Sequence, residues 1–444
     1  ETLDVNLKTP AASADSDKTE DPFSLDTVDF DDLDLDQAGG EKEKPDGDQT
    51  GDLTDLGLDG EPGQETEPLL EEDTSPAPDF HTTPRMIFRW QASGMGLGKV
   101  RWGLDIGTHT IKLVGVRKWF NSWQLNYVCL VEIAPGINVS LMDEASKQDA
   151  VEKAVGLAIK GKKNISKETV HSSIGNTSAV IRQIQYPQAV KDKLLTALQW
   201  EVRKYIPYEP DEVLVDAQIL SAKEGEKMMT VLLGAVPKEH ISMHMESLAK
   251  FSIAPRTVTA DSIAVIDAIS NDTNDSPSVQ PQILVIDVGF RSTSLCFYRS
   301  DGGFFTLSLS IGGDRITQQL AALTGITYAQ AEDLKCGRMV EDIELKPDDA
   351  LTYLMQVYEQ LYLEINKSIA FYKRQAGSGK LDRIYLCGGG AFLRELAPFL
   401  NDKLGKELSL SNKFDLFKLS KLDYTKLRKV AAQCTLAIGL AVKE

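Results

Sequence analysis

The sequence contains one short pattern twice, as Asp105-Ile-Gly-Thr-His-Thr-Ile-Lys112 and as Asp287-Val-Gly-Phe-Arg-Ser-Thr-Ser294, about 180 residues apart. Each copy follows an apolar run that predicts a buried strand, so the strand would deliver a carboxylate into a glycine turn. The glycine lets the backbone approach a phosphate closely, and hydroxyl and N–H groups of such a turn can bind phosphate oxygens. One Asp-x-Gly could be an ordinary hairpin turn. Two copies favour a pair of phosphate-binding loops.

Facing each other, the two loops would clamp a chain of phosphates. Asp105 and Asp287 would hold a hydrated Mg²⁺ on the phosphates, because this ion prefers oxygen ligands and keeps several of its waters. Lys112 would place a positive charge beside a phosphate. The candidate binding residues of the two loops are Asp105, Gly107, Thr108, His109, Thr110, Lys112, Asp287, Gly289, Ser292 and Thr293.

Two further elements lie in the second half of the chain. One is a predicted strand that runs into three glycines and then a helix, where bare backbone could pack against a flat adenine ring. The other is a Glu and a Lys three positions apart on one face of a predicted helix. That pair could be a surface salt bridge, but the combination favours contacts to ribose and adenine. The candidates are Gly388, Gly389, Gly390, Phe392, Glu332 and Lys335.

In this order, the four elements resemble those of the actin, hexokinase and heat-shock chaperone superfamily. Within it, the chain resembles the PilM family of type IV pilus assembly proteins over residues 86–444. The shared motifs include Gly103-Leu-Asp-Ile-Gly107, Tyr205-Ile-Pro-Tyr208, Val236-Pro-Lys-Glu239, Ser310-Ile-Gly-Gly-Asp-Arg-Ile-Thr317, Glu364-Ile-Asn-Lys-Ser-Ile369 and Ala437-Ile-Gly-Leu-Ala441. The sequence departs from the family at His109, where a small Ser or Ala is usual, and at 409–421, which lacks an Asn-Pro.

The resemblance implies an α/β, actin-like ATPase fold of the FtsA type that binds ATP and Mg²⁺. ATP would fix the angle between two lobes by a hinge mechanism, with slow or absent hydrolysis, and no catalytic residue is predicted. The implied partner is the cytoplasmic N-terminal peptide of a PilN-like inner-membrane protein, and pilus motor ATPases are further partners. The protein would work in the cytoplasm at the inner face of the membrane, which it would contact only through partners.

The first part of the chain has a different composition from the rest. Residues 1–84 contain 26 acidic and 4 basic residues, too little apolar surface to offset the entropy of ordering. We therefore predict a disordered acidic extension over 1–85, followed by a glycine-containing linker at 86–98. Alternating acidic and apolar residues at 23–36 could form a partner motif that folds on binding, although a solvating tail is the favoured interpretation.

The remainder divides into two predicted lobes. Lobe I covers 99–282 and contains a family-specific insertion at about 187–260. Lobe II covers 283–444 and contains a helical subdomain at about 324–375. A C-terminal helix at 429–442 is expected to pack back on lobe I.

Composition excludes several other classes of protein. Beyond residue 84 the chain has 40 acidic and 44 basic residues, so its charge gives no case for nucleic-acid binding. Its five cysteines contain no C-x-x-C pair, which argues against a zinc site or a disulfide framework. No apolar stretch is long enough to span a bilayer and no signal-peptide pattern is present. These features predict a soluble, cytoplasmic protein.

Three other functions were weighed against the pilus scaffold. An FtsA-like filament former ranks second. It would need a C-terminal amphipathic helix, and the residues at 441–444 show no such pattern. A small-molecule kinase would need a further carboxylate base, and no motif marks one. An interaction protein without nucleotide is disfavoured by the intact loops.

Two further patterns are not part of the predicted site. His240 and His244 have a metal-compatible spacing, but surface histidines are the favoured interpretation. The aromatic cluster Trp119, Phe120 and Trp123 is either strand packing or a partner surface.

Overall fold

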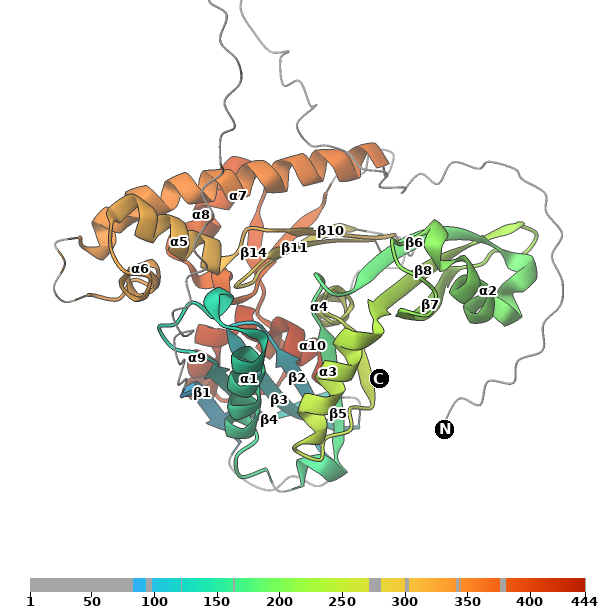
Figure 1. Cartoon of the computed structure of the whole chain (residues 1–444), viewed down its shortest axis with the longest axis horizontal. Coiled ribbons are helices and arrows are strands. Elements are labelled where there is room, and N and C mark those ends of the chain that lie inside the picture. Colours follow the sequence, from blue (N-terminus) through green and yellow to red (C-terminus); the bar gives the residue numbers. More distant parts are fainter. Residues whose placement is uncertain are drawn as a thin grey trace, which may run out of the picture. The chain divides into compact units, whose positions relative to one another are not determined.

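Lobe I is built on a six-stranded sheet with the order β1-β4-β3-β2-β5-β9 (Figure 1). β2 (Arg101–Ile106), β3 (Thr110–Trp119) and β4 (Ser122–Glu132) form an antiparallel meander. β5 (Thr169–Ile174) and β9 (Thr257–Ala260) run parallel to β2. The apolar run from Val100 to Val116 therefore makes two strands, because the glycine turn at 107–109 reverses the chain inside it.

Lobe II repeats this strand order as β12-β11-β10-β13-β14. β10 (Gln282–Val288), β11 (Thr293–Arg299) and β12 (Phe304–Leu309) form the meander, and β13 (Arg383–Cys387) and β14 (Leu408–Leu410) are parallel to β10. β10 is buried along its length except at Asp287. Asp105 and Asp287 thus occupy equivalent places near the ends of equivalent strands.

Helices cover both sheets. α1 (Glu144–Ala158) packs on lobe I and begins where Asp143 accepts a hydrogen bond from the Ser146 N–H. In lobe II, one apolar core joins the sheet to α5 (Gly313–Thr324), α6 (Tyr328–Lys335), α7 (Pro347–Gln375) and α8 (Leu396–Leu404). α6 starts with a capping box formed by Thr327 and Gln330, which satisfies backbone N–H groups at its first turn.

A small inserted sheet has the order β6-β8-β7. It consists of β6 (Val180–Pro187), β7 (Val213–Ser221) and β8 (Met228–Pro237), with α2 (Leu194–Glu201) on one side, and α3 (Lys238–Ala249) leads back to lobe I. The predicted insertion boundaries are corrected at both ends. β6 pairs with β8 from Val180 onward, so the inserted sheet begins earlier than residue 187, and β9 belongs to the sheet of lobe I.

Two helices connect the lobes. α4 (Asp261–Ser270) leads from lobe I into lobe II, and α10 (Thr435–Val442) returns to pack on β2 and α4. The approach of α10 is very close, because a Cβ at Gly103 would lie 2.0 Å from the Ala437 oxygen. Likewise, a Cβ at Gly439 would lie 2.0 Å from the Ala264 oxygen. The two glycines allow α10 to pack in direct backbone contact with β2 and α4.

The structure, a computed structural model, describes residues 83–92, 98–120, 122–162, 164–270, 281–299, 303–340, 343, 345–375 and 381–443, all within one compact unit. The predicted acidic extension lies outside the described residues as far as residue 82. The linker prediction is wrong for 86–91, since these residues form most of β1 (Arg85–Gln91), which pairs with β4. The Trp90 indole N–H donates at 2.9 Å to Asp423, which lies in the first turn of α9 (Lys421–Leu427).

No helix among the described residues is both long and apolar enough to cross a membrane.

Candidate nucleotide site between the lobes

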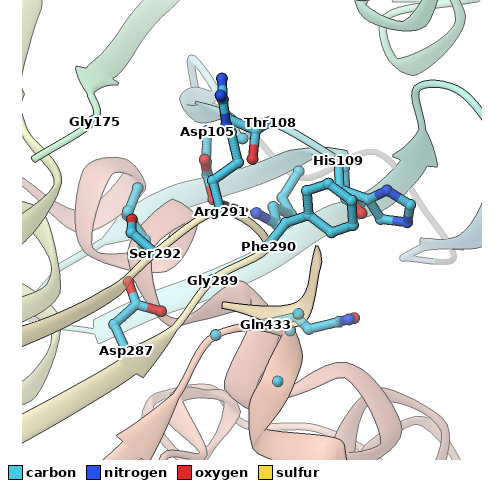
Figure 2. Close-up of a pocket in the computed structure, with 18 of the residues that line it drawn as sticks. Asp105, Thr108, His109, Gly175, Asp287, Gly289, Phe290, Arg291, Ser292 and Gln433 are labelled. Carbon is cyan, nitrogen blue, oxygen red and sulfur yellow. Dashed lines mark ion pairs between the residues drawn. The ribbon is translucent and has the colours of Figure 1, made fainter. Parts of the chain in front are cut away.

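A cavity of about 1130 Å³ lies between the lobes, at the ends of β2 and β10 (Figure 2). It brings together fourteen of the sixteen residues predicted from the sequence. Those lining the cavity are Asp105, Gly107, Thr108, His109, Thr110, Lys112, Asp287, Gly289, Ser292, Glu332, Lys335, Gly388, Gly389 and Gly390.

Asp105 and Lys112 form an ion pair in lobe I. They face each other across the β2–β3 hairpin, and the Lys112 Nζ lies 3.0 Å from the Asp105 Oδ2. Burial alone would lower the pKa of Lys112, but Asp105, with Asp287 and Asp261, raises it above its ordinary value. The lysine is therefore charged across the physiological range. A Cβ at Gly107 would lie 2.9 Å from the backbone carbonyl oxygen of Thr110, so the turn favours glycine.

Two more carboxylates face this pair. Burial raises the pKa of Asp287 to about 6, and the Asp105 carboxylate adds to the rise although Lys112 opposes it. Burial and Asp105 together raise the pKa of Asp261, the first residue of α4, to about 7. Three aspartates thus meet one lysine at this part of the cavity, so a cation there would stabilise their ionised forms.

The carboxylates fit a hydrated Mg²⁺ better than a directly ligated ion. Among the described residues, no three His, Cys, Asp or Glu side chains are grouped closely enough to hold a metal ion by themselves. Mg²⁺ commonly binds through one or two carboxylates, several waters and substrate phosphates. Asp105 and Asp287 fit that mode.

A stack of two aromatic rings joins the loops of the two lobes. The His109 ring lies 4.4 Å from the Phe290 ring at an interplanar angle of 15°, and Figure 2 shows the two rings side by side. The His109 Nε2 lies 3.4 Å from Glu132, which also receives a 2.6 Å hydrogen bond from Arg85 of β1. Burial would raise the pKa of Glu132, but His109 and Arg85 lower it to about 2.

The outer nitrogen of this histidine is unsatisfied. The Nδ1 of His109 is buried and has no hydrogen-bond partner within the described part of the chain. A buried polar nitrogen without a partner is costly. A ligand in the cavity could satisfy it, so the ring at this family departure is compatible with nucleotide.

Glu332 and Lys335 form a buried pair on α6. The Lys335 ammonium donates to Thr317 at 2.8 Å and forms an ion pair with Glu332, which accepts from Thr317 at 2.6 Å. Burial would raise the pKa of Glu332, but Lys335 lowers it. The alternative of a surface salt bridge is therefore wrong, because both residues are buried at the cavity wall.

Two of the three glycines after β13, Gly388 and Gly390, are required by close packing. Gly388 has φ +83, and a Cβ there would lie 2.3 Å from the Asp287 Oδ1. A Cβ at Gly390 would lie 2.2 Å from the Val288 side chain. The turn is therefore pressed against the end of β10, which fixes the Asp287 carboxylate beside the glycine backbone.

Two predicted site residues lie outside the cavity. Thr293 is buried, and its hydroxyl donates to the Ile311 carbonyl at 2.6 Å, so it is not available to a phosphate. Phe392 is 41% exposed but lies beyond the cavity wall. The structure therefore does not place either residue at the cavity.

Other cavity residues were missed, namely Asp261, Phe290, Arg291, Asn176 and Gln433. Asp261 directly follows β9, much as Asp105 lies near the end of β2. A third predicted strand followed by an aspartate was therefore the sequence signal that could have identified Asp261. Asn176 donates to Ser294 of lobe II at 2.9 Å and accepts from the Ser262 N–H. No sequence signal marked the long-range contacts of Asn176 or Gln433.

The sequence also matches a known family over most of its length. The family described as "Type IV pilus assembly protein PilM" matches residues 103–444. The chain belongs to the PilM family. A solved structure titled "PilM-PilN type IV pilus biogenesis complex" is 25% identical to this chain with a TM-score of 0.65. The match covers 77% of this chain and 98% of that chain.

A more distant structural match is the ethanolamine utilization protein EutJ from Carboxydothermus hydrogenoformans. It is 13% identical with a TM-score of 0.45, covering 79% of this chain and 91% of that chain. The match to the PilM-PilN structure, together with the repeated strand order of the two lobes, confirms the predicted α/β, actin-like fold. β1 (Arg85–Gln91) lies before residue 103, where the family match begins. The sixth strand of the lobe I sheet is therefore outside the residues that the family matches.

Proposed function

We propose that this PilM-family protein is a nucleotide-gated scaffold of the type IV pilus assembly platform, which binds Mg-ATP between its lobes. The observation that supports this most strongly is the cavity at the ends of two equivalent strands, with Asp105, Lys112 and Asp287 facing one another. A cavity that couples a cation site to both lobes suits a gating ligand better than a substrate for rapid turnover.

The two halves of the cavity would take different parts of the nucleotide. The turn N–H groups and hydroxyls of Thr108, Thr110 and Ser292 would hold phosphates, with Lys112 as the fixed positive charge. Glu332 and Lys335, already held rigid by Thr317, would face ribose and adenine. The Mg²⁺ of bound Mg-ATP would supply the positive charge that offsets the carboxylates at the strand ends.

Gating follows from contacts that cross between the lobes. Ser140 of lobe I donates to Asp314 of lobe II at 2.7 Å, and Asn176 donates to Ser294 at 2.9 Å. The His109 and Phe290 rings form a third contact. An apolar cluster that includes Val265, Ile283 and Leu440 also joins the lobes through α4 and α10. The polar bonds and the ring stack at the cavity can be remade at another angle while that cluster holds the lobes together, so filling the cavity would select one angle. We propose slow or absent hydrolysis and assign no catalytic residue.

The proposed partner is the cytoplasmic N-terminal peptide of a PilN-like membrane protein, because the structurally similar complex contains PilN. We place its groove beside the inserted sheet, where a hollow of about 500 Å³ is lined by the segment from Arg203 to Glu212 that contains Tyr205-Ile-Pro-Tyr208. This partner would hold the protein in the cytoplasm at the inner face of the membrane, and pilus motor ATPases are proposed as further partners.

A thermal-shift titration of the full chain tests the nucleotide part. Mg-ATP at a hundred times its Kd would stabilise the native state by about 2.7 kcal/mol, which for about 340 folded residues raises Tm by about 4 °C. Asp287→Ala should lose this shift, whereas the matched variant Asp143→Ala at an exposed helix cap should keep it. A synthetic PilN-type peptide should add a separate shift. If Mg-ATP leaves Tm unchanged in the unaltered protein, the proposed nucleotide function is wrong.

A further inference from the structure

The end of the lobe I sheet that lies opposite the nucleotide cavity has an unusual surface. Asp105 marks the cavity end of β2, and the other end begins at Arg101, which pairs with Val116 of β3 and Thr169 of β5. β9 starts at this end too, since the Arg256 N–H donates to the Val170 carbonyl. We call this surface the basal end and define it as residues 98–101, 116–120, 122–125, 159–162, 164–169 and 250–257.

The basal end is strongly basic in a chain whose formal charge is −18. Within these segments Glu168 is the only acidic residue, and its carboxylate accepts the Trp102 indole N–H at 2.6 Å. Lys250 forms an ion pair with Glu152 of α1 and is therefore not counted among the cations of this surface. Adjacent strands lie about 4.8 Å apart, so the ends of β3, β2, β5 and β9 span roughly 15 Å. The cations at or beside these strand ends are Lys99, Arg101, Arg117, Lys118, Lys167 and Arg256, and Lys160 and Lys162 follow α1.

The β3–β4 hairpin carries two exposed aromatic rings at this end. The Phe120 side chain is 86% exposed, the highest value among the described large hydrophobic residues, and Trp119 is 43% exposed. Their ring centroids lie 5.4 Å apart. Behind them, the Lys118 Nζ lies 5.5 Å from the Trp123 ring. The aromatic cluster is therefore divided, with Trp123 packed into the core and the other two rings at the surface.

The conformation of Phe120 argues that this ring has a role outside the fold. Its φ is +52, a region that favours Gly, Asn or Asp and that a bulky side chain adopts only at a cost. The ring gains little from burial in exchange. A residue that suits neither the turn nor the solvent is best explained by a partner that covers it.

We propose that the basal end docks on an anionic phospholipid membrane. Trp119 and Phe120 would enter the interfacial region, where aromatic rings are favoured, while the surrounding cations face acidic headgroups. The rings protrude from a hairpin tip among spread cations, a form that suits a fluid interface better than a protein pocket. This contact is direct and independent of the peptide partner, and it leaves the nucleotide cavity at the far end of the sheet open.

The test is co-sedimentation of the full chain with vesicles, without nucleotide or peptide. Vesicles of phosphatidylcholine mixed with phosphatidylglycerol should bind the protein, and pure phosphatidylcholine vesicles should not. Binding should weaken steeply between about 0.1 M and about 1 M salt, where the Debye length falls from about 10 Å to about 3 Å. Lys118→Glu should lower the partition coefficient roughly tenfold or more, since it changes the local charge by two.

Phe120→Asn gives the sharper result. It should lower vesicle binding at least several-fold while leaving Tm unchanged or higher, because Asn suits the positive φ. The matched controls lie in lobe II, where Met339 is 76% exposed and Lys346 is exposed. Met339→Asn and Lys346→Glu should bind as the unaltered protein does.

Two outcomes would overturn the proposal. Equal losses in the lobe II controls would mean that binding is not located at the basal end. No sedimentation with anionic vesicles at low salt would exclude a membrane and assign the basal end to an acidic protein surface instead. Neither outcome bears on the Mg-ATP shift, so failure here and failure of the proposed function are distinguishable.

Discussion

Replacing Asp287 with Asn should stabilise the ligand-free protein at neutral pH. The pKa of Asp287 is raised from its ordinary 3.8 to about 6. A raised carboxyl pKa means that its stabilising contribution is fully present below about pH 4 and is lost as pH rises through about 6. The difference is about 2 units, and each unit corresponds to 1.36 kcal/mol, so the largest loss is about 3 kcal/mol. Asn cannot ionise and avoids that loss.

Urea unfolding of the full chain at pH 5 and pH 8 measures this effect. The unaltered protein should lose more unfolding free energy between the two pH values than Asp287→Asn, by about 1.4 kcal/mol, because roughly half of the total loss has already occurred at pH 5. Asp143→Asn is the matched control, because Asp143 is an exposed cap whose pKa is lowered by bonds from Ser146. Mg²⁺ with nucleotide should narrow the difference. If Asp287→Asn follows the pH profile of the unaltered protein, the carboxylates do not repel one another as described.

Three other substitutions test parts of the fold and site. Glu332→Gln leaves the Lys335 ammonium buried without its counter-charge and should cost about 3–5 kcal/mol in urea unfolding; a loss below about 1 kcal/mol would contradict a buried ion pair. Gly103→Ala forces a Cβ toward the Ala437 oxygen and should lower stability by about 1–3 kcal/mol or more by calorimetry, so an unchanged Tm would argue against the close packing of α10. Phe290→Ala removes a ring pair worth about 0.5–1.5 kcal/mol and should speed release of a fluorescent ATP analogue about 2–10-fold in stopped flow, whereas an unchanged rate would show that the stack does not hold the lobes.

The repeat of Asp-x-Gly after an apolar run, together with the glycine turn, the Glu332 and Lys335 pair and the family resemblance, predicted the two-lobed fold. The pattern is local, since it depends on one strand and the turn that follows it. Asp105 and Asp287 consequently lie where the sequence placed them, at equivalent strand ends. Glu332 and Lys335 also line the cavity, because helix periodicity puts them on one face.

Features that depend on contacts between residues far apart in the sequence could not be predicted from local patterns. β1 alternates in exposure along Arg85–Gln91, but only its pairing with β4 distinguishes a strand from a linker. The stack of His109 on Phe290 joins residues from different lobes, so neither neighbourhood contains a signal for it. Thr293 looked like its neighbour Ser292, yet strand alternation turns it into the core.

The packing of α10 on β2 also has a consequence for biosynthesis. More than three hundred residues separate Gly103 from the helix that covers it. At roughly 5–20 residues per second, a ribosome would take tens of seconds between making the two elements. During that time the apolar face of β2 stays exposed to solvent, because α10 has not been made. Lobe II can already fold, because its strands are contiguous in the chain. Newly made lobe I is therefore a natural client for chaperones, and it would reach its final form last although it is synthesised first.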